Sequence, residues 1–418
     1  MTGTPIHNSI NDFYSLIKFL NFEPLSEFGL WKYLFATMLS KVVKPTKDNE
    51  IREKRCNQWV FLLSKYLILR RTKADKITGT EKRLVDLPDK NIQEIRIKLN
   101  PEEKAIYSKI FHEAKNEANK FLTTQKQRML GRTTTESQGS GLSRIFVMIL
   151  RLRQACCHMS LLSECLDKDE LKTMRLETEG VEGLMETLNI NDTIGCETDI
   201  PVFNPMSNST MNQTSKDTGE DVDLTKCLKK KYMSSKLESL IDMIEQFSEE
   251  YPDDKMIVVS QWTSMLEVVA RNLEKREIEY CEVKGDVKLN IRNDIVEDFN
   301  KPENKRVRVM LLSLTAGGVG LNLVGANRMF LLDIHWNPAL EQQCADRIYR
   351  VGQTKEVTIY KFLCENTIEQ RILEVQGKKL SMADKVCNAQ ASNGTSSLGN
   401  GKLTTSDLKL LFQDFEDE

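Results

Sequence analysis

Short apolar runs alternate with amphipathic stretches throughout the second half of the chain. The runs have the length of β-strands, and the stretches between them carry apolar residues at helical spacing. The runs read "KMIVVS", "VRVMLLSL", "RMFLLDI" and "VTIYKFL", and the stretches read "SMLEVVARNLEKR", "IRNDIVEDFN" and "ALEQQCADRIYR". Strands that are apolar almost without interruption are buried on both faces, which is typical of a parallel sheet covered by helices. The sequence therefore predicts an α/β domain over residues 232–388.

The first part of the chain, by contrast, reads as mostly helical. The stretch "SINDFYSLIKFLNF" carries apolar residues on one helical face, namely Ile10, Phe13, Leu16, Ile17 and Leu20. A second helix is expected over "NQWVFLLSKYLILRRTKAD". The alternation in "NIQEIRIKLN" predicts one strand, and a further helix is expected to begin after it, with Asn100 as its cap and Pro101 in its first turn.

Polar segments separate these parts. Residues 123–140 are rich in Gly, Ser and Thr and are expected to form a flexible loop. A buried helix is predicted over 141–163. Residues 164–231 are polar and low in aromatic residues, so they are predicted to be disordered. Residues 389–418 are expected to form a flexible tail that ends in a short helix, "TTSDLKLLFQDF".

Composition sets broad limits on function. Hydrophobic residues make up 40% and charged residues 29% of the 418 residues, which is ordinary for a globular protein. The formal net charge of −2 argues against a basic coat but allows a local basic groove. No apolar run is long enough for a membrane span, and we expect no secretory signal and no membrane partner.

The ten cysteines are expected to be reduced, buried thiols, because none form C-x-x-C pairs. Cys156, Cys157 and His158 are adjacent, which is not the spacing of zinc ligands. We therefore predict no metal site.

A glycine-rich loop directly follows the run "VRVMLL". It reads "SLTAGGVGLNL", with Gly317, Gly318 and Gly320. Glycines let a backbone approach a ligand closely, and N–H groups exposed after a strand can bind phosphate. The alternative is a tight turn that only glycine permits, with no ligand.

Two arginines stand three residues apart in "NPALEQQCADRIYRVGQ". On a predicted helix ended by Gly352, Arg347 and Arg350 would point the same way. Paired guanidinium groups suit phosphate oxygens, and in ATPases they stabilise charge on the transferring phosphoryl group. The alternative is a solvated helix end whose cations favour the helix dipole.

Trp336 lies in "DIHWNPA", just after an apolar run, and we expect it to be partly exposed. A tryptophan there could contact a nucleic-acid groove or base, and core packing is the alternative.

Several stretches taken together resemble Swi/Snf-type helicase-like ATPases of superfamily two. They occur in the family's order: "TGTPIHN", "LILRRTKAD", "LRLRQACCH", "SQWTSMLEVV", "LTAGGVGLNLVGANRMFLLDIHWNP" and "QQCADRIYRVGQ". The resemblance implies two RecA-like lobes that use ATP to translocate along double-stranded DNA. It assigns residues 1–122 to the remainder of lobe one with a helical protrusion, 141–163 to the inter-lobe region, and 232–388 to lobe two.

The resemblance also implies roles for individual residues of this sequence. Arg347 and Arg350 would be arginine fingers, and Gln353 would support them. Gly318 and Gly320 would lie at the nucleotide cleft.

On the DNA side, Gln261, Trp262 and Thr263 would lie near the phosphates of the tracked strand, and Trp336 would touch the minor groove. Asp286 departs from the family pattern and would repel phosphate, so no DNA contact is expected there. His7 also departs, which leaves its role open.

The opening residues Thr2, Gly3, Thr4 and Pro5 look like the family's third helicase motif, which couples the lobes. No phosphate loop and no acidic box for magnesium occur in this sequence, so the resemblance implies that the parent protein binds ATP with Mg through residues that precede this chain. "SSLGNGKL" is not a phosphate loop, because Ser396 and Leu403 occupy two of its required positions. The chain alone is not expected to hydrolyse ATP.

Within the family, "CCHMSLL", "SQWTSMLEVVA" and "LLDIHWNP" most resemble the branch that terminates transcription. That likeness implies a nuclear, monomeric DNA-dependent ATPase that acts on an RNA polymerase elongation complex. One alternative is a non-catalytic DNA- or partner-binding fragment. Another is a chain severed within lobe one, in which residues 1–40 expose apolar helix faces and aggregate.

Overall fold

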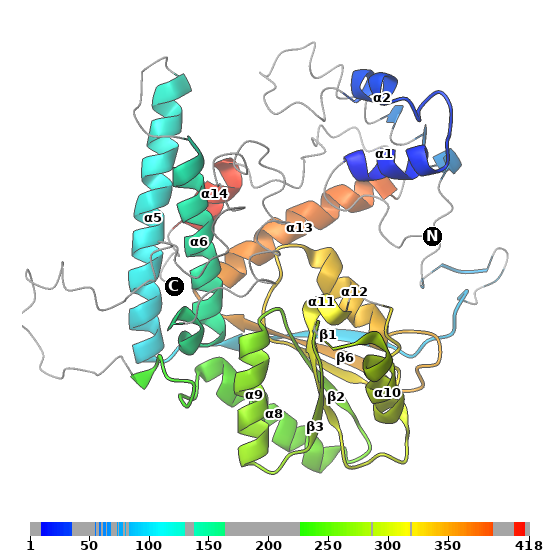
Figure 1. Ribbon diagram of the computed structural model, residues 1–418, viewed down its shortest axis with the longest axis vertical. Helices are drawn as coiled ribbons and strands as arrows, with labels where there is room; N and C mark the ends of the chain where they lie inside the picture. Colours follow the sequence, from blue (N-terminus) through cyan, green and yellow to red (C-terminus); the bar gives the residue numbers. More distant parts are fainter. Residues whose placement is uncertain are drawn as a thin grey trace, which may run out of the picture. The chain divides into compact units, whose positions relative to one another are not determined.

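A computed structural model provides the structure of the chain, shown as a ribbon in Figure 1. It describes residues 10–35, single residues and short runs between 55 and 80, and residues 83–129, 138–163, 226–285, 287–317, 320–387 and 405–413. Two compact units are distinguished. The smaller comprises Met1–Asp86, Glu177–Val181 and Glu374–Thr404, and the larger comprises Leu87–Leu176, Glu182–Leu373 and Thr405–Glu418.

In the described part of the smaller unit, α1 (Ile10–Phe19) and α2 (Phe28–Leu34) pack around one tryptophan. Trp31 is fully buried, Phe13 meets it edge-on with ring centroids 6.1 Å apart, and Phe35 lies at 4.2 Å. The apolar face predicted for the first helix is confirmed at Phe13 and Ile17, whereas Leu20 is exposed.

The larger unit is built on a six-stranded sheet in which every pair of neighbouring strands is parallel. The order is β1-β6-β5-β2-β4-β3. The strands are β1 (Lys90–Ile97), β2 (Met256–Ser260), β3 (Tyr280–Val283), β4 (Val309–Ser313), β5 (Arg328–Leu331) and β6 (Val357–Cys364). The predicted α/β fold with a parallel sheet is confirmed. Strand β3 was not predicted from the sequence, because it is only four residues long and half-buried.

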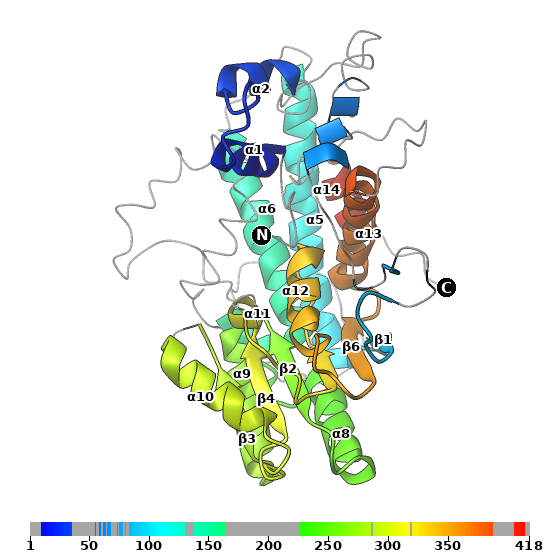
Figure 2. The ribbon, with the colours of Figure 1, turned by 90° about the vertical axis from the view of Figure 1, so that its right-hand side faces the viewer.

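Helices α8 (Ser235–Glu250) and α9 (Thr263–Lys275) pack on one face of the sheet, and α10 (Leu289–Asn300) and α12 (Pro338–Ile348) pack on the other (Figures 1 and 2). The other helical elements are α5 (Pro101–Met129), α6 (Gln138–Cys157), the 3₁₀ turn η1 (Met159–Ser163), α11 (Leu314–Gly317), α13 (Ile368–Cys387) and α14 (Thr405–Leu411). None of the helices in the described ranges combines the length and hydropathy that a membrane span requires.

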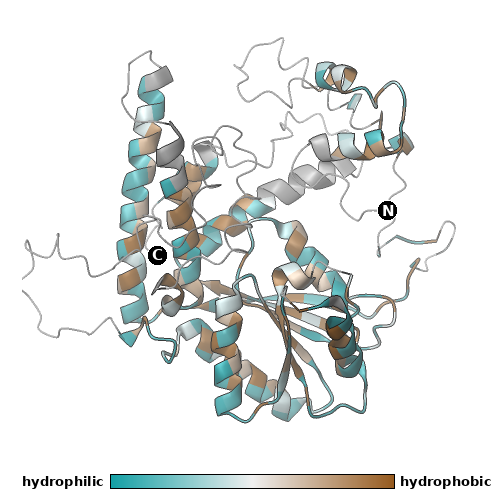
Figure 3. Cartoon of the chain, in the orientation of Figure 1, coloured by the Kyte–Doolittle hydropathy of each residue, from teal (hydrophilic) through white to brown (hydrophobic). Residues whose placement is uncertain are grey.

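Successive strand residues enter two separate hydrophobic cores. On β2, for example, Met256 and Val258 pack with α8 and α9, whereas Ile257 and Val259 pack with α10 and α12. The alternation follows from the pleat of a strand, which points neighbouring side chains to opposite faces. Figure 3 shows hydrophobic residues gathered in the strands and on the helices beside them. Each fully buried aliphatic side chain contributes about 1.5–3 kcal/mol, so both faces stabilise the sheet.

Strand β1 pairs with β6 along its whole length, from Lys90 opposite Val357 to Ile97 opposite Cys364. It therefore belongs to the same sheet as β2–β6, and the unit boundary falls between Asp86 and Leu87. The segment 1–122 expected from the resemblance contains this boundary. Local alternation predicts a strand, but it carries no information about which sheet that strand joins.

The polar segment predicted as a loop over 123–140 is shorter than expected. Helix α5 continues to Met129 and α6 begins at Gln138, because residues 123–129 include good helix formers such as Gln, Lys and Met. The two helices lie side by side in Figures 1 and 2. The predicted cap of α5 is confirmed: the Asn100 side chain accepts from the Glu103 amide at 2.8 Å, and Glu103 accepts from the Asn100 amide.

The predicted disordered insert, 164–231, lies outside the described residues up to 225. Residues 226–231 form a turn in which Cys227 is buried, so the insert ends earlier than predicted. In the predicted tail, 389–418, α14 is helical as expected, and Leu408 and Leu411 are buried.

Candidate functional site

The carboxyl ends of the strands lie along one edge of the sheet, and polar residues gather there. Ser260 ends β2, Ser313 ends β4, and Asp333 follows β5 two residues after its last residue. In open parallel sheets this edge is where ligands bind, because the loops that leave the strands converge on it. Gln261, Trp262, Gly320 and Trp336, all proposed from the sequence, lie on these loops.

The glycine-rich loop begins at the end of β4 with the short helix α11. Gly317 lies so close to α12 that an added Cβ would stand 2.9 Å from the Cys344 sulfur. Gly320 has a φ of +39°, a conformation that side chains rarely adopt, and its Cβ direction is open. Gly318 lies outside the described residues. The loop thus needs one glycine for packing and another for backbone conformation.

Arg347 and Arg350 both bond to this loop. The Arg347 Nε donates to the Gly317 carbonyl at 2.8 Å, and an Arg350 nitrogen donates to the Leu321 carbonyl at 3.4 Å. Arg347 is half-buried in the last turn of α12, whereas Arg350 is exposed. The prediction that both lie on one helix is wrong, because α12 ends at Ile348. The two side chains point the same way because both bond to the glycine-rich loop.

Gln353 is a buried connector near the starts of β5 and β6. Its Nε2 donates to the carbonyls of Ala326 at 2.8 Å and of Ile348 at 3.1 Å, and also to that of Val324 at 3.3 Å. Its Oε1 accepts from the amides of Thr354 and Lys355. The side chain therefore joins the end of α12 to the segment before β5 and supports the turn that carries Arg350.

The residues proposed near DNA phosphates follow β2. Thr263 is half-buried and begins α9. Trp262 is only 2% exposed, so its ring belongs to the core. The Gln261 amide group turns inward, and its Oε1 accepts from Arg153 at 2.8 Å. The backbone at the start of α9, rather than the two larger side chains, is thus the outward part of this segment.

Trp336 was expected to be partly exposed and is instead buried, with 8% of its surface exposed. The loop that carries it is fixed by a chain of bonds: Glu341 accepts from the His335 amide at 2.9 Å, and Lys361 donates to Glu341 at 2.8 Å. Asn337 caps α12 by accepting from the Ala339 amide. This folding of the loop draws the indole inward, which a strand-end position alone does not predict.

Asp333 and Arg153 were not identified from the sequence. The Asp333 carboxylate is 4% exposed and accepts from the Ser260 hydroxyl and the Gln261 amide. Burial raises the pKa of Asp333 to about 6, although these hydrogen bonds and the cations Arg153 and Lys236 oppose the rise. An acidic residue directly after an apolar run was the available signal for Asp333.

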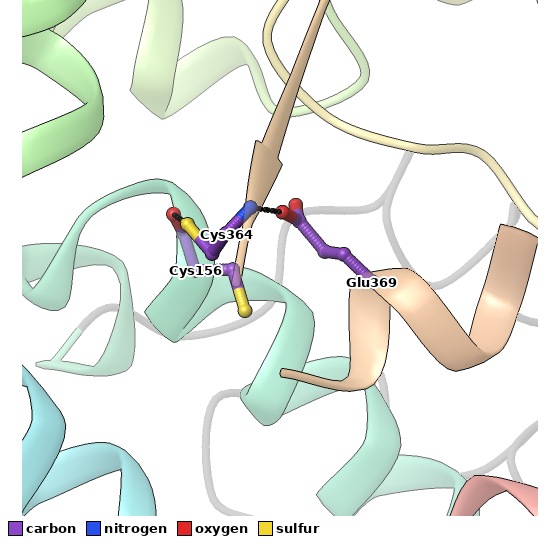
Figure 4. Close-up of side chains that lie close together, drawn as sticks. All are labelled: Cys156, Cys364 and Glu369. Atoms are coloured by element: carbon purple, nitrogen blue, oxygen red, sulfur yellow. Dashed lines mark hydrogen bonds between the residues drawn. The ribbon is translucent and has the colours of Figure 1, made fainter. Parts of the chain in front are cut away.

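Cys156, Cys364 and Glu369 form the group among the described residues that could in principle hold a metal, and Figure 4 shows them converging from α6, β6 and α13. Lys236 already occupies the carboxylate, donating to both Glu369 oxygens at 2.7 and 2.9 Å. Burial raises the pKa of the Cys156 thiol well above its usual range, so it lacks the thiolate that a metal requires. The group fits a buried ion pair better than a metal.

His158 does not act as a metal ligand in this arrangement either. Its Nδ1 lies 2.8 Å from the Ser160 hydroxyl and its Nε2 lies 2.9 Å from the Tyr232 carbonyl. Nε2 thus joins the end of α6 to the segment before α8, and Nδ1 bonds to η1.

The coupling motif Thr2, Gly3, Thr4 and Pro5 lies outside the described residues, as do His7 and Asp286. For ATP, the guanidinium groups at the glycine-rich loop fit the polyphosphate part. In the described part of the chain, this edge offers no set of free carboxylates for magnesium, since Asp333 is bonded to Ser260 and Gln261.

Two family models match this chain. Residues 1–161 match the SNF2-related domain, and residues 235–352 match the helicase conserved C-terminal domain. The second match contains the glycine-rich loop, Arg347 and Arg350.

Similar proteins extend beyond this chain. Transcription termination factor 2 of Drosophila melanogaster is 35% identical over 99% of the chain and 40% of its own length. DNA repair protein RAD5 of Candida glabrata is 28% identical over 92% of the chain and 38% of its own length. The chain thus spans about 40% of the length of these relatives.

Among solved structures, the Sulfolobus solfataricus SWI2/SNF2 ATPase core in complex with dsDNA is 24% identical, with a TM-score of 0.45, and the match covers 99% of this chain and 66% of that one. The domain matches and the order of the motifs along the sequence agree. The chain therefore belongs to the SNF2-related, Swi/Snf-type family of helicase-like ATPases.

Proposed function

We propose that this chain is the C-terminal part of a double-stranded-DNA-dependent ATPase that acts in transcription termination. The observation that carries the ATPase part is the bonding of Arg347 and Arg350 to one glycine-rich loop. Two guanidinium groups held against one glycine-rich loop can bind phosphate oxygens through their planar sets of donors. ATP, when bound with magnesium, supplies the phosphoryl group whose negative charge such groups neutralise.

The chain's own residues would act around the glycine-rich loop as follows. Arg350 is the exposed arginine and would reach the phosphate, while Arg347 keeps the glycine-rich loop in place and lies beside it. Gln353 would hold the turn between them, and Gly318 and Gly320 would let the backbone approach the nucleotide. The coupling motif, Thr2 to Pro5, would link this lobe to the preceding one.

For DNA, we extend the proposal to the segment after β2. The start of α9 at Thr263 would face the phosphates, because helix N-terminal amides attract anions. Gln261, Trp262 and Trp336 would shape this surface from beneath, since they are turned inward or buried. Family membership supports duplex DNA as the partner.

The termination role is supported by the likeness to transcription termination factor 2. It implies an RNA polymerase elongation complex as partner and the nucleus as the place of action. We further propose that the protein works as a monomer.

The ATPase proposal is tested in the full-length product of the gene with Arg350→Ala. We expect ATP turnover to fall by about 10³ or more while binding to duplex DNA is retained. Arg306→Ala is the matched control: the Arg306 side chain is 81% exposed and precedes β4, whereas the glycine-rich loop follows this strand. Normal turnover in the Arg350 variant would contradict the assignment of Arg350.

The termination proposal needs a separate assay with a stalled RNA polymerase elongation complex on immobilised duplex DNA. The wild-type protein with ATP is expected to release the transcript, and the Arg350→Ala protein is not. Transcript retained on the template while the same protein hydrolyses ATP would remove the termination role and leave the ATPase role standing.

A further inference from the structure

Arg153 joins helix α6 to two loops at the carboxyl edge of the sheet. Its guanidinium donates to the Gln261 side chain at 2.8 Å and to the Ile334 carbonyl at 2.9 Å. These partners lie 108 and 181 residues away in the sequence. Arg153 is 3% exposed, so the bonds are made inside the protein.

In the proposed function, the loops that contain Gln261 and Ile334 lie on the side that binds DNA. Gln261 stands two residues before the first residue of α9, and Ile334 stands two residues before Trp336. A guanidinium group is planar and rigid, so two acceptors bonded to one of its nitrogens are held at a fixed spacing. A change in either loop would therefore be felt by the other.

The surroundings favour a charged side chain at this point. Asp333 directly precedes Ile334, and the Arg153 charge is one of the influences that counter the rise in its pKa. The Trp262 ring faces the guanidinium, with 5.6 Å between the guanidinium carbon and the ring centroid. Removal of Arg153 would take away one of two links between the loops and leave the bonds of Asp333 to Ser260 and the Gln261 amide as the other.

A neighbouring arginine makes a useful comparison. Arg151 also lies on α6 and is also buried, at 6% exposure. Arg151 donates to Gln154 on the same helix at 2.9 Å and to the Leu161 carbonyl in η1 at 3.2 Å. These two partners lie within ten residues of it, so Arg151 is a control for the loss of a buried arginine on α6.

We infer that Arg153 is a positioning residue that aligns the start of α9 and the Ile334–Trp336 loop for binding duplex DNA. The claim that this alignment serves DNA binding rests on the proposed function. The claim that Arg153 aligns the two loops rests on its contacts and does not depend on the proposed function.

The test compares Arg153→Met, Arg153→Lys and the control Arg151→Met in the full 418-residue chain. Hydrogen–deuterium exchange measures how well the backbone of each loop is held in place. Arg153→Met is expected to speed exchange in peptides over 260–264 and 332–337, whereas Arg151→Met is expected to speed it over 158–162. Equal effects of the two variants on all three peptides would overturn the positioning role.

Fluorescence anisotropy with a labelled 30-base-pair duplex measures the affinity for DNA. We expect about tenfold weaker binding in Arg153→Met, which corresponds to about 1.4 kcal/mol. Arg153→Lys should recover part of the affinity because it keeps the charge and one donor, and Arg151→Met should bind as the wild type does. Wild-type affinity in Arg153→Met would overturn the inference, whereas a wild-type chain that does not bind the duplex would overturn the DNA-binding part of the proposed function instead.

If Arg153→Met does not fold, Arg153→Lys and Gln261→Ala provide a second test. Because both change the same bond, the double variant is expected to bind DNA no more weakly than the weaker single variant. Additive losses in the double variant would show that the two residues act separately and would overturn the inference.

Discussion

At the scale of single residues, buried polar side chains hold the loops at both ends of the sheet in shape. Gln353, Asp333 and Arg153 each bond to segments that are far apart in the sequence or that leave different elements. Buried polar groups are stable only when their hydrogen bonds are made, so each of these residues requires its partners to stay in place.

Gln353→Ala tests the connector beneath the arginine turn. We expect the free energy of unfolding to fall by about 3 kcal/mol, since the change leaves several buried backbone groups without partners. Urea denaturation measures this. Gln342→Ala on the exposed side of α12 is the control, with an expected change below about 0.5 kcal/mol. Similar losses in both variants would contradict the role given to Gln353.

Asp333→Asn tests the buried carboxyl group through its pH dependence. Burial raises the pKa of Asp333 to about 6, above that of an unfolded aspartate, so the folded state holds the proton more tightly. The resulting stabilisation is complete below about pH 4 and is lost as the pH rises through 6. Asparagine stays neutral, so the variant should gain about 2–3 kcal/mol relative to the wild type between pH 4 and 7.

Urea unfolding of both proteins at several pH values provides the measurement, and Asp242→Asn, an exposed position on α8, controls for the substitution itself. A difference between wild type and Asp333→Asn that stays constant across this range would contradict the raised pKa.

At the scale of elements, one buried ion pair fastens α8 to the centre of the sheet. Lys236, at the start of α8, is 1% exposed and donates to Glu369 on α13 and to the carbonyl of Leu332 after β5. Glu369 also accepts from the Cys364 amide at the end of β6. The pair thus connects two helices with two neighbouring strands.

Lys236→Met should lower the free energy of unfolding by about 3–5 kcal/mol, because it leaves a buried carboxylate without its cation. Replacing both partners, with Lys236→Met and Glu369→Leu, should cost less than Lys236→Met alone. Lys230→Met breaks a half-exposed pair with Glu267 and should change stability by less than about 1 kcal/mol. Equal losses for Lys236→Met and Lys230→Met in chemical denaturation would contradict this account.

Elements with a strong local pattern could be predicted from the sequence, and their partners could not. Apolar runs and helical spacing predicted β2, β4, β5 and β6 and the helices between them. The helix that carries Arg347 was predicted too long, because Ile348 bonds to Gln353 instead of continuing the helix. Trp336 was predicted at the surface, because its burial depends on a loop fold held by Glu341 and Lys361.

The candidate site was predictable in part for the same reason. Glycines and arginines are recognisable in the sequence by chemistry and spacing, and the structure brings Arg347 and Arg350 to one loop. Arg153 gave no such signal, since its partners lie 108 and 181 residues away and only the folded chain joins them.

At the scale of the whole molecule, the chain comprises two compact units and matches two family domains. The larger unit contains the parallel sheet, the glycine-rich loop, both arginines and the segment proposed to face DNA. In the proposed function, nucleotide and DNA would therefore both bind to segments of this one unit.

ATP turnover by the full-length gene product, measured with and without duplex DNA, tests the central claim most directly. The account predicts that duplex DNA raises turnover severalfold, that single-stranded DNA of the same length raises it less, and that Arg350→Ala abolishes the response. Turnover that is the same with and without DNA, or that persists in the Arg350 variant, would contradict the account.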